Sequence, residues 1–548
     1  MLHYKKIIKF AAMSLTLVVM MGCTDLEEEL NSTLTISEVS SSLGTNGTSL
    51  LLSATYSDLR SNFASGPLGN IDAMQEITTD EAVIQARGGD WDDNGVWRAL
   101  HQHKWDADHV RIRNTFNGLN KMNFDATNVL GFKPNEQQEA EARVLRAFAL
   151  YSLLDMYGQY PLRNPGENLL LAPEVKRGEE AVDFIIDEIV VSLPSLPTNS
   201  VNKISPEAAK ALLMRCYLNK GAFINKQVPT FAAEDMQKVI SYGNEIINTG
   251  KYSYEDNFFD NFSPENASST EAILAWSNTG GNSVDNSGPQ MNWIPSVHYN
   301  SYSKRYGDAG WNGLATTKDF YDSFNCTGLP VTYSPSDTIW DLRLGGRVTS
   351  NTKSTKTSGI RPGFLVGQQY NEKGEKLNDR RGNLLTYNTP QQAEDGFELG
   401  NTLELSGIRV VKYAPDYDFY SGPAGNDVMI LRISDVVLMV AEAKLRLDIN
   451  DASALALINE LRAVRQAVPL SSITLVNTSD INDPLTLLSE RGRELYWESV
   501  RRTDLIRFGV FLKPWGLKTV INDPKNLVFP VPNQALSANP NLVQNPGY

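Results

Sequence analysis

The chain has 548 residues, of which 41% are hydrophobic and 21% are charged, and its formal net charge is −14. This composition provides ample apolar material for a large core and excludes a chain that is disordered throughout. The acidic balance argues against nucleic acid as a partner, because proteins that bind phosphate backbones carry clustered positive charge. Neutral ligands are compatible with this charge.

Residues 1–22 have the pattern of a lipoprotein signal peptide. Lysines cluster between residues 5 and 9, and the apolar run at 11–21 is too short to span a bilayer. The run is followed directly by Gly22-Cys23. A small residue before a cysteine is typical of the site at which bacterial lipoproteins are cleaved and lipidated. An uncleaved anchor or an ordinary secretory signal would not explain this cysteine, so we expect Cys23 to carry lipid.

Residues 23–47 predict a flexible tether between this anchor and a folded body. Acidic residues follow Cys23 closely, and serine, threonine and glycine are frequent in the rest. Cys216 and Cys326 lie in the body, and their spacing does not show whether they pair. Cys216 lies within a helical pattern, which favours a buried small apolar side chain.

Residues 48–251 predict a helical region. Between Glu139 and Gly158, apolar residues recur at helical spacing and form a face wide enough to be buried on several sides. Ser205 followed by Pro206 predicts a helix start, with serine as the N-cap and proline in the first turn. The predicted helices come in pairs with small residues between them, and such pairs resemble tetratricopeptide repeats.

Residues 252–420 differ in character, because Gly, Ser, Asn, Asp and aromatic residues are frequent and long helical periods are few. We expect an irregular lobe of long loops, short helices and short strands. The apolar run that ends at Trp276 predicts one buried strand.

Helices return in residues 421–548. Their predicted positions are 434–447, 451–466 and 483–508, with Asp451 and Asp483 as N-caps of the last two. The Pro- and Asn-rich end of the chain is predicted to be extended rather than part of a central strand.

Four segments, taken together, resemble the SusD/RagB family. Each is a modest motif alone, but their order, their spacing and their position after a lipoprotein signal are specific. The resemblance covers essentially the whole mature chain. The segments are Ala140–Leu162, Leu431–Ala443, Glu490–Gly509 and Phe529–Tyr548.

This resemblance implies a mainly α fold, with a tetratricopeptide-like scaffold of helix pairs and an irregular, loop-rich lobe that builds the ligand surface. It also implies a glycan ligand, a lipid anchor in the outer membrane that leaves the protein facing the cell exterior, and a SusC-like TonB-dependent transporter as partner. Charged residues of the four segments stand beside apolar residues on predicted helices. We therefore expect Arg–carboxylate pairs that position the scaffold rather than bind ligand.

A neutral glycan is held by aromatic platforms and by hydrogen bonds from Asn, Asp, Gln and Arg side chains. The first cluster of such residues, between 80 and 109, offers Arg87, Trp91, Asp92 and Asn94 as ligand-binding candidates. Trp91 is the strongest candidate, because glycines surround it and a loop of this kind packs poorly. Trp97 is predicted to lie in the core.

A second cluster, between 293 and 311, offers Trp293, Tyr299 and Trp311. Each of the two tryptophans is flanked by polar or glycine residues. For both rings, a position in the core and a position on the ligand platform remain open.

The same region contains a partial metal motif. Asp90 to Gly95 matches the start of a calcium-binding loop, but His101 stands where the bidentate glutamate is required. An EF-hand is therefore not expected, and only another mode of structural calcium binding stays open. His101, His103 and His109 lack the spacing of a known metal site, which favours solvated or capping histidines. We expect no cofactor.

Three functions are compatible with these observations. The favoured one is a surface protein that captures oligo- or polysaccharide and delivers it to the transporter. A binding subunit for peptide or glycoconjugate uptake is the rival, and a glycoside hydrolase is the third. No nucleophile elbow, P-loop or metalloprotease motif is present, so an enzyme is not expected.

Overall fold

Helices dominate the first half of the folded unit in the computed structural model. The structure describes residues 46–87, 90–198, 200–283, 288–301, 310–324, 341–345, 362–369, 376–387, 404–420 and 422–548. The expected lipid site Cys23, the signal peptide and Cys326 lie outside these residues. Residues Thr45–Tyr548 form one unit, which is described below.

The N-terminal helices pack in sequence order. They are α3 (Gly47–Phe63), α4 (Asn70–Glu76), α5 (Val96–His101), α6 (Val110–Gly131), α7 (Glu136–Tyr157), α8 (Gly178–Ser192), α9 (Pro206–Ile224) and α10 (Ala233–Ile247). From α6 to α10, each helix contacts the next along the chain. This arrangement confirms the predicted scaffold of helix pairs.

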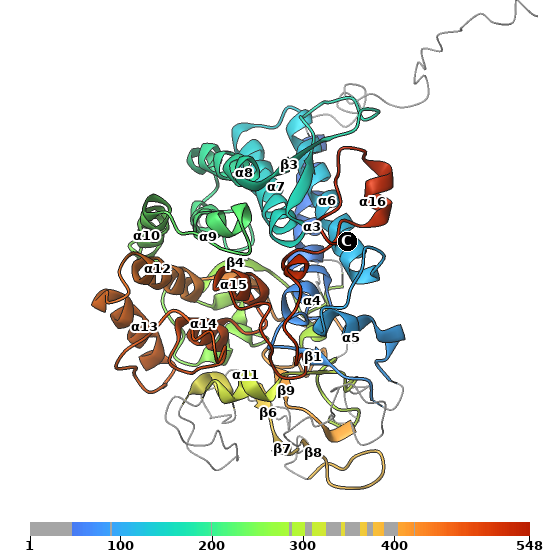
Figure 1. Cartoon of the computed structure of the whole chain (residues 1–548), viewed down its shortest axis with the longest axis vertical. Coiled ribbons are helices and arrows are strands. Elements are labelled where there is room, and N and C mark those ends of the chain that lie inside the picture. Colours follow the sequence, from blue (N-terminus) through green and yellow to red (C-terminus); the bar gives the residue numbers. More distant parts are fainter. Residues whose placement is uncertain are drawn as a thin grey trace, which may run out of the picture. The chain divides into compact units, whose positions relative to one another are not determined.

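The C-terminal helices extend the same series. They are α12 (Ile433–Leu447), α13 (Ala452–Val464), α14 (Leu487–Leu495), α15 (Arg501–Arg507) and α16 (Asn533–Ala538). Helix α12 packs on α10, and α13 packs on α12. Figure 1 shows the series descending along one side of the unit from α8 to α13. No helix of the described residues is long and apolar enough to cross a membrane.

The described parts of the middle region contain short strands, short 3-10 helices and one short α-helix, α11 (Lys318–Asp322). Across the described residues of the whole unit, the strands are β1 (Val83–Ile84), β2 (Gln159–Leu162), β3 (Glu174–Arg177), β4 (Ala272–Trp276), β5 (Leu314–Ala315), β6 (Gly363–Leu365), β7 (Gly367–Gln368), β8 (Thr386–Tyr387), β9 (Arg409–Val411) and β10 (Val428–Arg432). Within the described ranges they form antiparallel pairs, and β6 to β9 lie at the lower end of the view in Figure 1. The pair β1–β5 places Val83 opposite Ala315, which brings the two predicted ligand clusters to one place.

Two helices start where side chains close in the sequence cap their first turn. The Ser205 side chain accepts a hydrogen bond from the Ala208 amide, and Asp451 caps α13 in the same way. Both N-cap predictions are confirmed. Cys216 is buried in α9 and free, as its helical position indicated.

The predicted helix at 483–508 is wrong in its bounds. The structure has two helices there, α14 and α15, and the N-cap of α14 is Thr486 rather than Asp483. Trp497 and Ser499 adopt positive φ angles of 57° and 60° between the helices. The chain turns there because the Ser499 amide donates to Glu76 (2.7 Å), while the Trp497 amide donates to Glu81 (3.2 Å).

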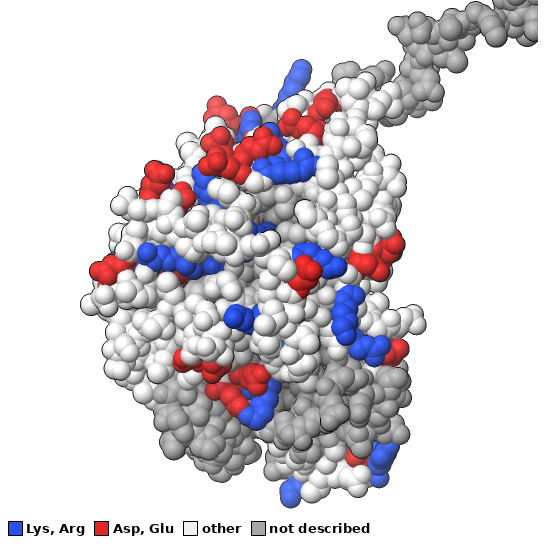
Figure 2. Space-filling view, viewed as in Figure 1, with Lys and Arg blue, Asp and Glu red and all other residues white. Residues whose placement is uncertain are grey.

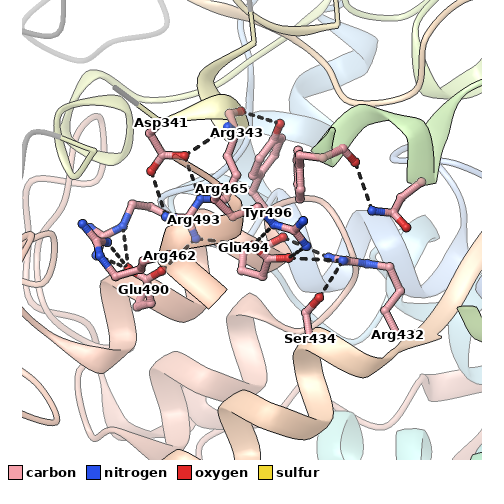
Figure 3. Close-up of polar contacts among 12 residues, drawn as sticks. Asp341, Arg343, Arg432, Ser434, Arg462, Arg465, Glu490, Arg493, Glu494 and Tyr496 are labelled. Atoms are coloured by element: carbon pink, nitrogen blue, oxygen red, sulfur yellow. Dashed lines mark hydrogen bonds and ion pairs between the residues drawn. The ribbon is translucent and has the colours of Figure 1, made fainter. Parts of the chain in front are cut away.

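A buried network of charges joins the C-terminal helices to the middle region, as Figure 3 shows. Glu490 forms ion pairs with Arg343 (2.8 Å) and Arg462 (2.5 Å), and Glu494 forms one with Arg465 (2.9 Å). Burial alone would raise the pKa of Glu490, but Arg343, Arg493 and Arg462 outweigh it and hold the pKa well below its usual range. The expectation that these charges position the scaffold is confirmed.

Candidate functional site

The loop that carries Trp91 has a strained backbone. Trp91, Asp93 and Asn94 all have positive φ angles, of 65°, 42° and 55°. Positive φ is uncommon for residues with a side chain and costs free energy, and such residues cluster at functional sites. The loop is closed at its base, where the Arg87 amide donates to the Asp90 carbonyl over 2.7 Å. Gly88 and Gly89 lie outside the described residues.

A second loop, at residues 310–313, lies against the first. The Trp91 indole nitrogen donates to the main-chain oxygen of Trp311 over 2.7 Å, and the two ring centroids are 6.3 Å apart. Trp91 also covers Gly313 so closely that a Cβ added there would lie 2.3 Å from the ring. The side chain of Trp311 is 43% exposed, whereas Trp91 is partly buried. The two predicted clusters therefore meet in a single aromatic surface, which we call the Trp91–Trp311 face.

Polar groups lie beside Tyr299, close to this face. The Tyr299 hydroxyl donates to Asp90 over 2.6 Å, and the Arg380 guanidinium lies 4.2 Å above the Tyr299 ring. Burial, followed by the bond to Asp90, raises the pKa of Tyr299 to about 12, so the phenol stays protonated at neutral pH. The Asp90 and Arg380 side chains are 52% and 47% exposed and 3.7 Å apart.

Arg380 is a site residue that the sequence analysis missed. Its segment is held in place by Glu404, whose carboxylate accepts from the Arg380 amide over 3.2 Å and contacts His298 at 2.8 Å. Nothing in the local sequence links Arg380 to Tyr299 or Asp90. The contact depends on tertiary packing between segments about eighty residues apart.

Arg87 has a different role from the predicted one. Its side chain is buried, and its guanidinium donates to the Gly313 carbonyl (3.2 Å) and the Ser406 carbonyl (3.1 Å). The prediction that it binds ligand is corrected, because the group is used to hold the Trp91 and Trp311 loops together.

For Trp293, a candidate ligand residue, the structure decides between the two positions left open in favour of the core. Its ring is fully buried in the core of the middle region, where it packs 6.1 Å from Tyr420. It therefore offers no face to a ligand. Trp97, predicted to lie in the core, is indeed buried, and its indole donates to Asp93 over 2.6 Å.

Asp92 and Asn94 lie on the exposed part of the Trp91 loop. Asp92 approaches Arg98 at 3.8 Å, and Asn94 is exposed. Their contact with a ligand stays a prediction. Residues 302–309 of the second predicted cluster lie outside the described residues.

Metal binding finds no support in the described ranges, where His, Cys, Asp and Glu form no cluster that could hold an ion. His101 and His103 are buried and contact main-chain oxygens, so the expectation of solvated histidines is wrong for both. Burial lowers the pKa of His101 to about 4, and it stays neutral at physiological pH.

Taken as chemistry, the Trp91–Trp311 face offers apolar ring surface beside exposed carboxylate, guanidinium and amide groups. Aromatic rings shed water when a flat apolar surface covers them. The neighbouring polar groups can fix the orientation of a ligand that carries many hydroxyl groups.

Comparison with known proteins identifies the family. The model of the SusD family matches residues 270–548. The chain belongs to the SusD family. This SusD-family protein is 23% identical over 501 residues to the starch-binding protein SusD of Bacteroides thetaiotaomicron, covering 86% of this chain and 84% of that protein. The SusD/RagB resemblance inferred from sequence is therefore confirmed.

Solved structures share the fold of this SusD-family chain. A SusD superfamily protein from Parabacteroides distasonis has a TM-score of 0.67 and 16% identity, covering 92% of this chain and 99% of that one. A laminarin-binding SusD-like protein has a TM-score of 0.63 and 19% identity, covering 92% of this chain and 100% of that one. These likenesses confirm the predicted mainly α fold.

Proposed function

We propose that this protein is a cell-surface glycan-binding protein that captures oligo- or polysaccharide and delivers it to a TonB-dependent outer-membrane transporter. The observation that carries the proposal is the Trp91–Trp311 face, in which a strained loop and a hydrogen bond hold two indole rings at the surface. Sugar rings have flat C–H faces that stack on such surfaces, and hydroxyl groups at their edges bind neighbouring polar side chains.

Family membership supports glycan as the ligand class. The curated relative is named a starch-binding protein, and one structural neighbour is named a laminarin-binding protein. The chain itself supplies the aromatic rings and the polar groups at Asp90, Tyr299 and Arg380 that such ligands require.

The protein binds its ligand without converting it. SusD-family members act as binding proteins, and buried charged groups such as Arg343 and Glu490 pair with each other in the scaffold. Catalysis by paired carboxylates needs an acid and a base on opposite sides of a bound bond. The Asp90 carboxylate instead accepts from the Tyr299 hydroxyl over 2.6 Å and lies 3.7 Å from the Arg380 guanidinium.

Lipid at Cys23 would hold the protein on the outer membrane, facing the exterior. The signal-like residues 1–22 and the polar residues 23–47 support this location. A SusC-like transporter is the partner that the family implies, and the glycan would pass from the Trp91–Trp311 face to that transporter.

An affinity-gel panel of plant, fungal and host polysaccharides tests the function. A soluble form that begins at Thr24 is run with the Trp311→Ala variant and with Leu447→Ala, which removes an exposed apolar side chain at the end of α12. We expect one polysaccharide class to retard the wild type and Leu447→Ala much more strongly than Trp311→Ala, with no product released. Retardation by peptides alone would favour the peptide-uptake role, and released oligosaccharides would favour a hydrolase.

A further inference from the structure

A pocket lies between α6, the β2–β3 hairpin and the C-terminal segment around α16. We call it the second pocket, because it lies apart from the Trp91–Trp311 face. Its cavity volume is about 270 Å³. None of the residues of the Trp91–Trp311 face lines it. Ligand pockets commonly range from about 300 Å³ upward, so this volume suits a single ring rather than a long chain.

The two sites are connected by one helix. Near the start of α6, the Arg111 guanidinium lies 4.4 Å from the Trp97 ring, which is itself 6.5 Å from the Trp91 ring. Phe124 of the same helix lines the second pocket. At 1.5 Å per residue, the helix rises roughly 20 Å between Arg111 and Phe124. One rigid element therefore fixes the spacing of the two sites.

The wall of the pocket is largely apolar. Phe116 and Leu542 are buried, Pro161 and Pro173 come from the hairpin, and Phe124 contributes a ring. Phe124 is 39% exposed and lines the pocket, so part of its ring is open to a ligand there. The ring provides a flat apolar surface, and covering that surface with an apolar face of a ligand is favourable.

A row of carboxamides follows the same face of α6. Asn117, Asn120 and Asn123 are spaced by three residues, so they lie along one side of the helix. Asparagine is a poor helix former, so helix stability does not account for three of them in a row. Two of them contain a buried acceptor: the side-chain oxygens of Asn120 and Asn123 have no hydrogen-bond partner among the described residues.

The hydrogen bonds of these two amides show which side-chain atom is the oxygen. The Asn123 side chain donates to the Pro161 carbonyl over 2.9 Å, and the Asn120 side chain donates to the Phe116 carbonyl over 2.9 Å. Flipping either amide would place an oxygen against a carbonyl oxygen. Both oxygens are unpaired among the described residues but buried, so each side chain would have to rotate before its oxygen could accept from a donor in the pocket.

The opposite rim adds donors. Gln534 of α16 is exposed, and Arg163 lies beside the hairpin, where its guanidinium also donates to the Asn168 carbonyl at 3.3 Å. Among the described residues that line the pocket there is no carboxylate, so these residues do not favour a cation. A ligand with hydroxyl groups fits best, because each hydroxyl can donate to an amide oxygen and accept from an amide or guanidinium N–H.

We propose that this pocket binds a second sugar ring of the captured glycan, with its C–H face on Phe124 and its hydroxyls on the α6 carboxamides. The inference rests on the proposed glycan-binding function and extends it from one site to two. Two sites on one rigid chain raise the retention of a long polysaccharide above that of either site alone, because binding at the second site becomes intramolecular.

Calorimetric titration and gel retardation test the proposal with the soluble form from Thr24. The probes are the polysaccharide that retards the wild type and an oligosaccharide cut from it. The variants are Phe124→Ala, Gln534→Ala at an exposed position of α16, and Trp311→Ala. Leu447→Ala serves as the control, and melting temperatures confirm that each variant folds.

We expect two oligosaccharide sites per wild-type chain and one in Phe124→Ala. Polysaccharide retardation should weaken about tenfold or more in Phe124→Ala and also weaken in Gln534→Ala, while oligosaccharide binding at the Trp91–Trp311 face persists. One site per wild-type chain, with Phe124→Ala indistinguishable from it, would overturn the second site and leave the proposed function intact. A wild type that binds no glycan would overturn both.

Discussion

The Trp91 indole donates a hydrogen bond of 2.7 Å to the main-chain oxygen of Trp311, across 220 residues of sequence. This bond ties the two loops of the proposed ligand face to each other. The donor is the indole ring of Trp91, and the acceptor is the backbone of Trp311. Movement of either loop therefore disturbs both rings. The face should therefore respond to substitutions as one unit.

Gly313→Ala tests that dependence. An added Cβ would lie 2.3 Å from the Trp91 ring, so the ring must move away and lose its place beside Trp311. We expect glycan affinity to fall at least tenfold, or about 1.4 kcal/mol, in calorimetric titration. Gly422→Ala is the matched control, since a Cβ there meets nothing within 4 Å. Unchanged affinity in Gly313→Ala would show that the ring position does not matter to binding.

Arg380→Ala tests the polar side of the face. Arg380 lies over Tyr299 and beside Asp90, and its side chain is 47% exposed. We expect affinity to fall severalfold, while stability changes by less than about 0.5 kcal/mol, as for other surface substitutions. The neighbouring Arg381→Ala makes the same change of charge at an exposed position and should bind like the wild type. Equal losses in both variants would indicate a general effect of charge.

Removing Glu490 tests the scaffold. Arg343, Arg462 and Arg493 would be left buried with fewer partners. We expect Glu490→Ala to cost about 3–5 kcal/mol of unfolding free energy, the usual cost of breaking a buried ion pair. Asp322→Asn breaks the exposed pair with Lys318 and should cost less than about 1 kcal/mol. Urea unfolding measures both, and similar small losses would contradict the structural role of the network.

Acid should destabilise the protein through Glu442. Burial would raise the pKa of this carboxyl, but Arg507 and Arg446 lower it to about 2, against an ordinary value near 4.5. A lowered carboxyl pKa stabilises the fold above the unfolded value, and this contribution is lost as the pH falls from about 5 to 2. The full contribution is about 3 kcal/mol. Between pH 5 and pH 3, the unfolding free energy should fall less steeply in Glu442→Gln than in the wild type. Parallel curves for the two proteins would exclude this carboxyl as a source of the loss of stability in acid.

Cys23→Ala tests the proposed anchor. Without a thiol to acylate, the protein should no longer fractionate with the outer membrane and should appear in the soluble fraction. Ser42→Ala, a change in the predicted tether, is the control that should remain attached. Full membrane retention of Cys23→Ala would contradict lipid attachment at this residue.

Sequence predicted the parts of the fold that depend on near neighbours. The N-caps at Ser205 and Asp451 are determined within one helical turn, and both were found where expected. The break after α14 was missed, because the carboxylates of Glu76 and Glu81 that hold it come from about 420 residues earlier.

The candidate site shows the same limit. The sequence located the two aromatic clusters, and polar neighbours made Trp293 and Trp311 look alike. Their burial is decided by distant partners: Trp293 packs against Tyr420, whereas Trp311 lies at the surface beside Trp91. Arg380 was missed for the same reason, since only the fold brings it to Tyr299.

The most direct test of the central claim is calorimetric titration of the wild type and Trp311→Ala with an oligosaccharide from the polysaccharide that the wild type retains. The Trp311 side chain is 43% exposed, so the substitution should leave the melting temperature nearly unchanged. The account predicts that binding at the Trp91–Trp311 face weakens at least tenfold, or about 1.4 kcal/mol. Wild-type affinity and site number in a well-folded Trp311→Ala protein would contradict it.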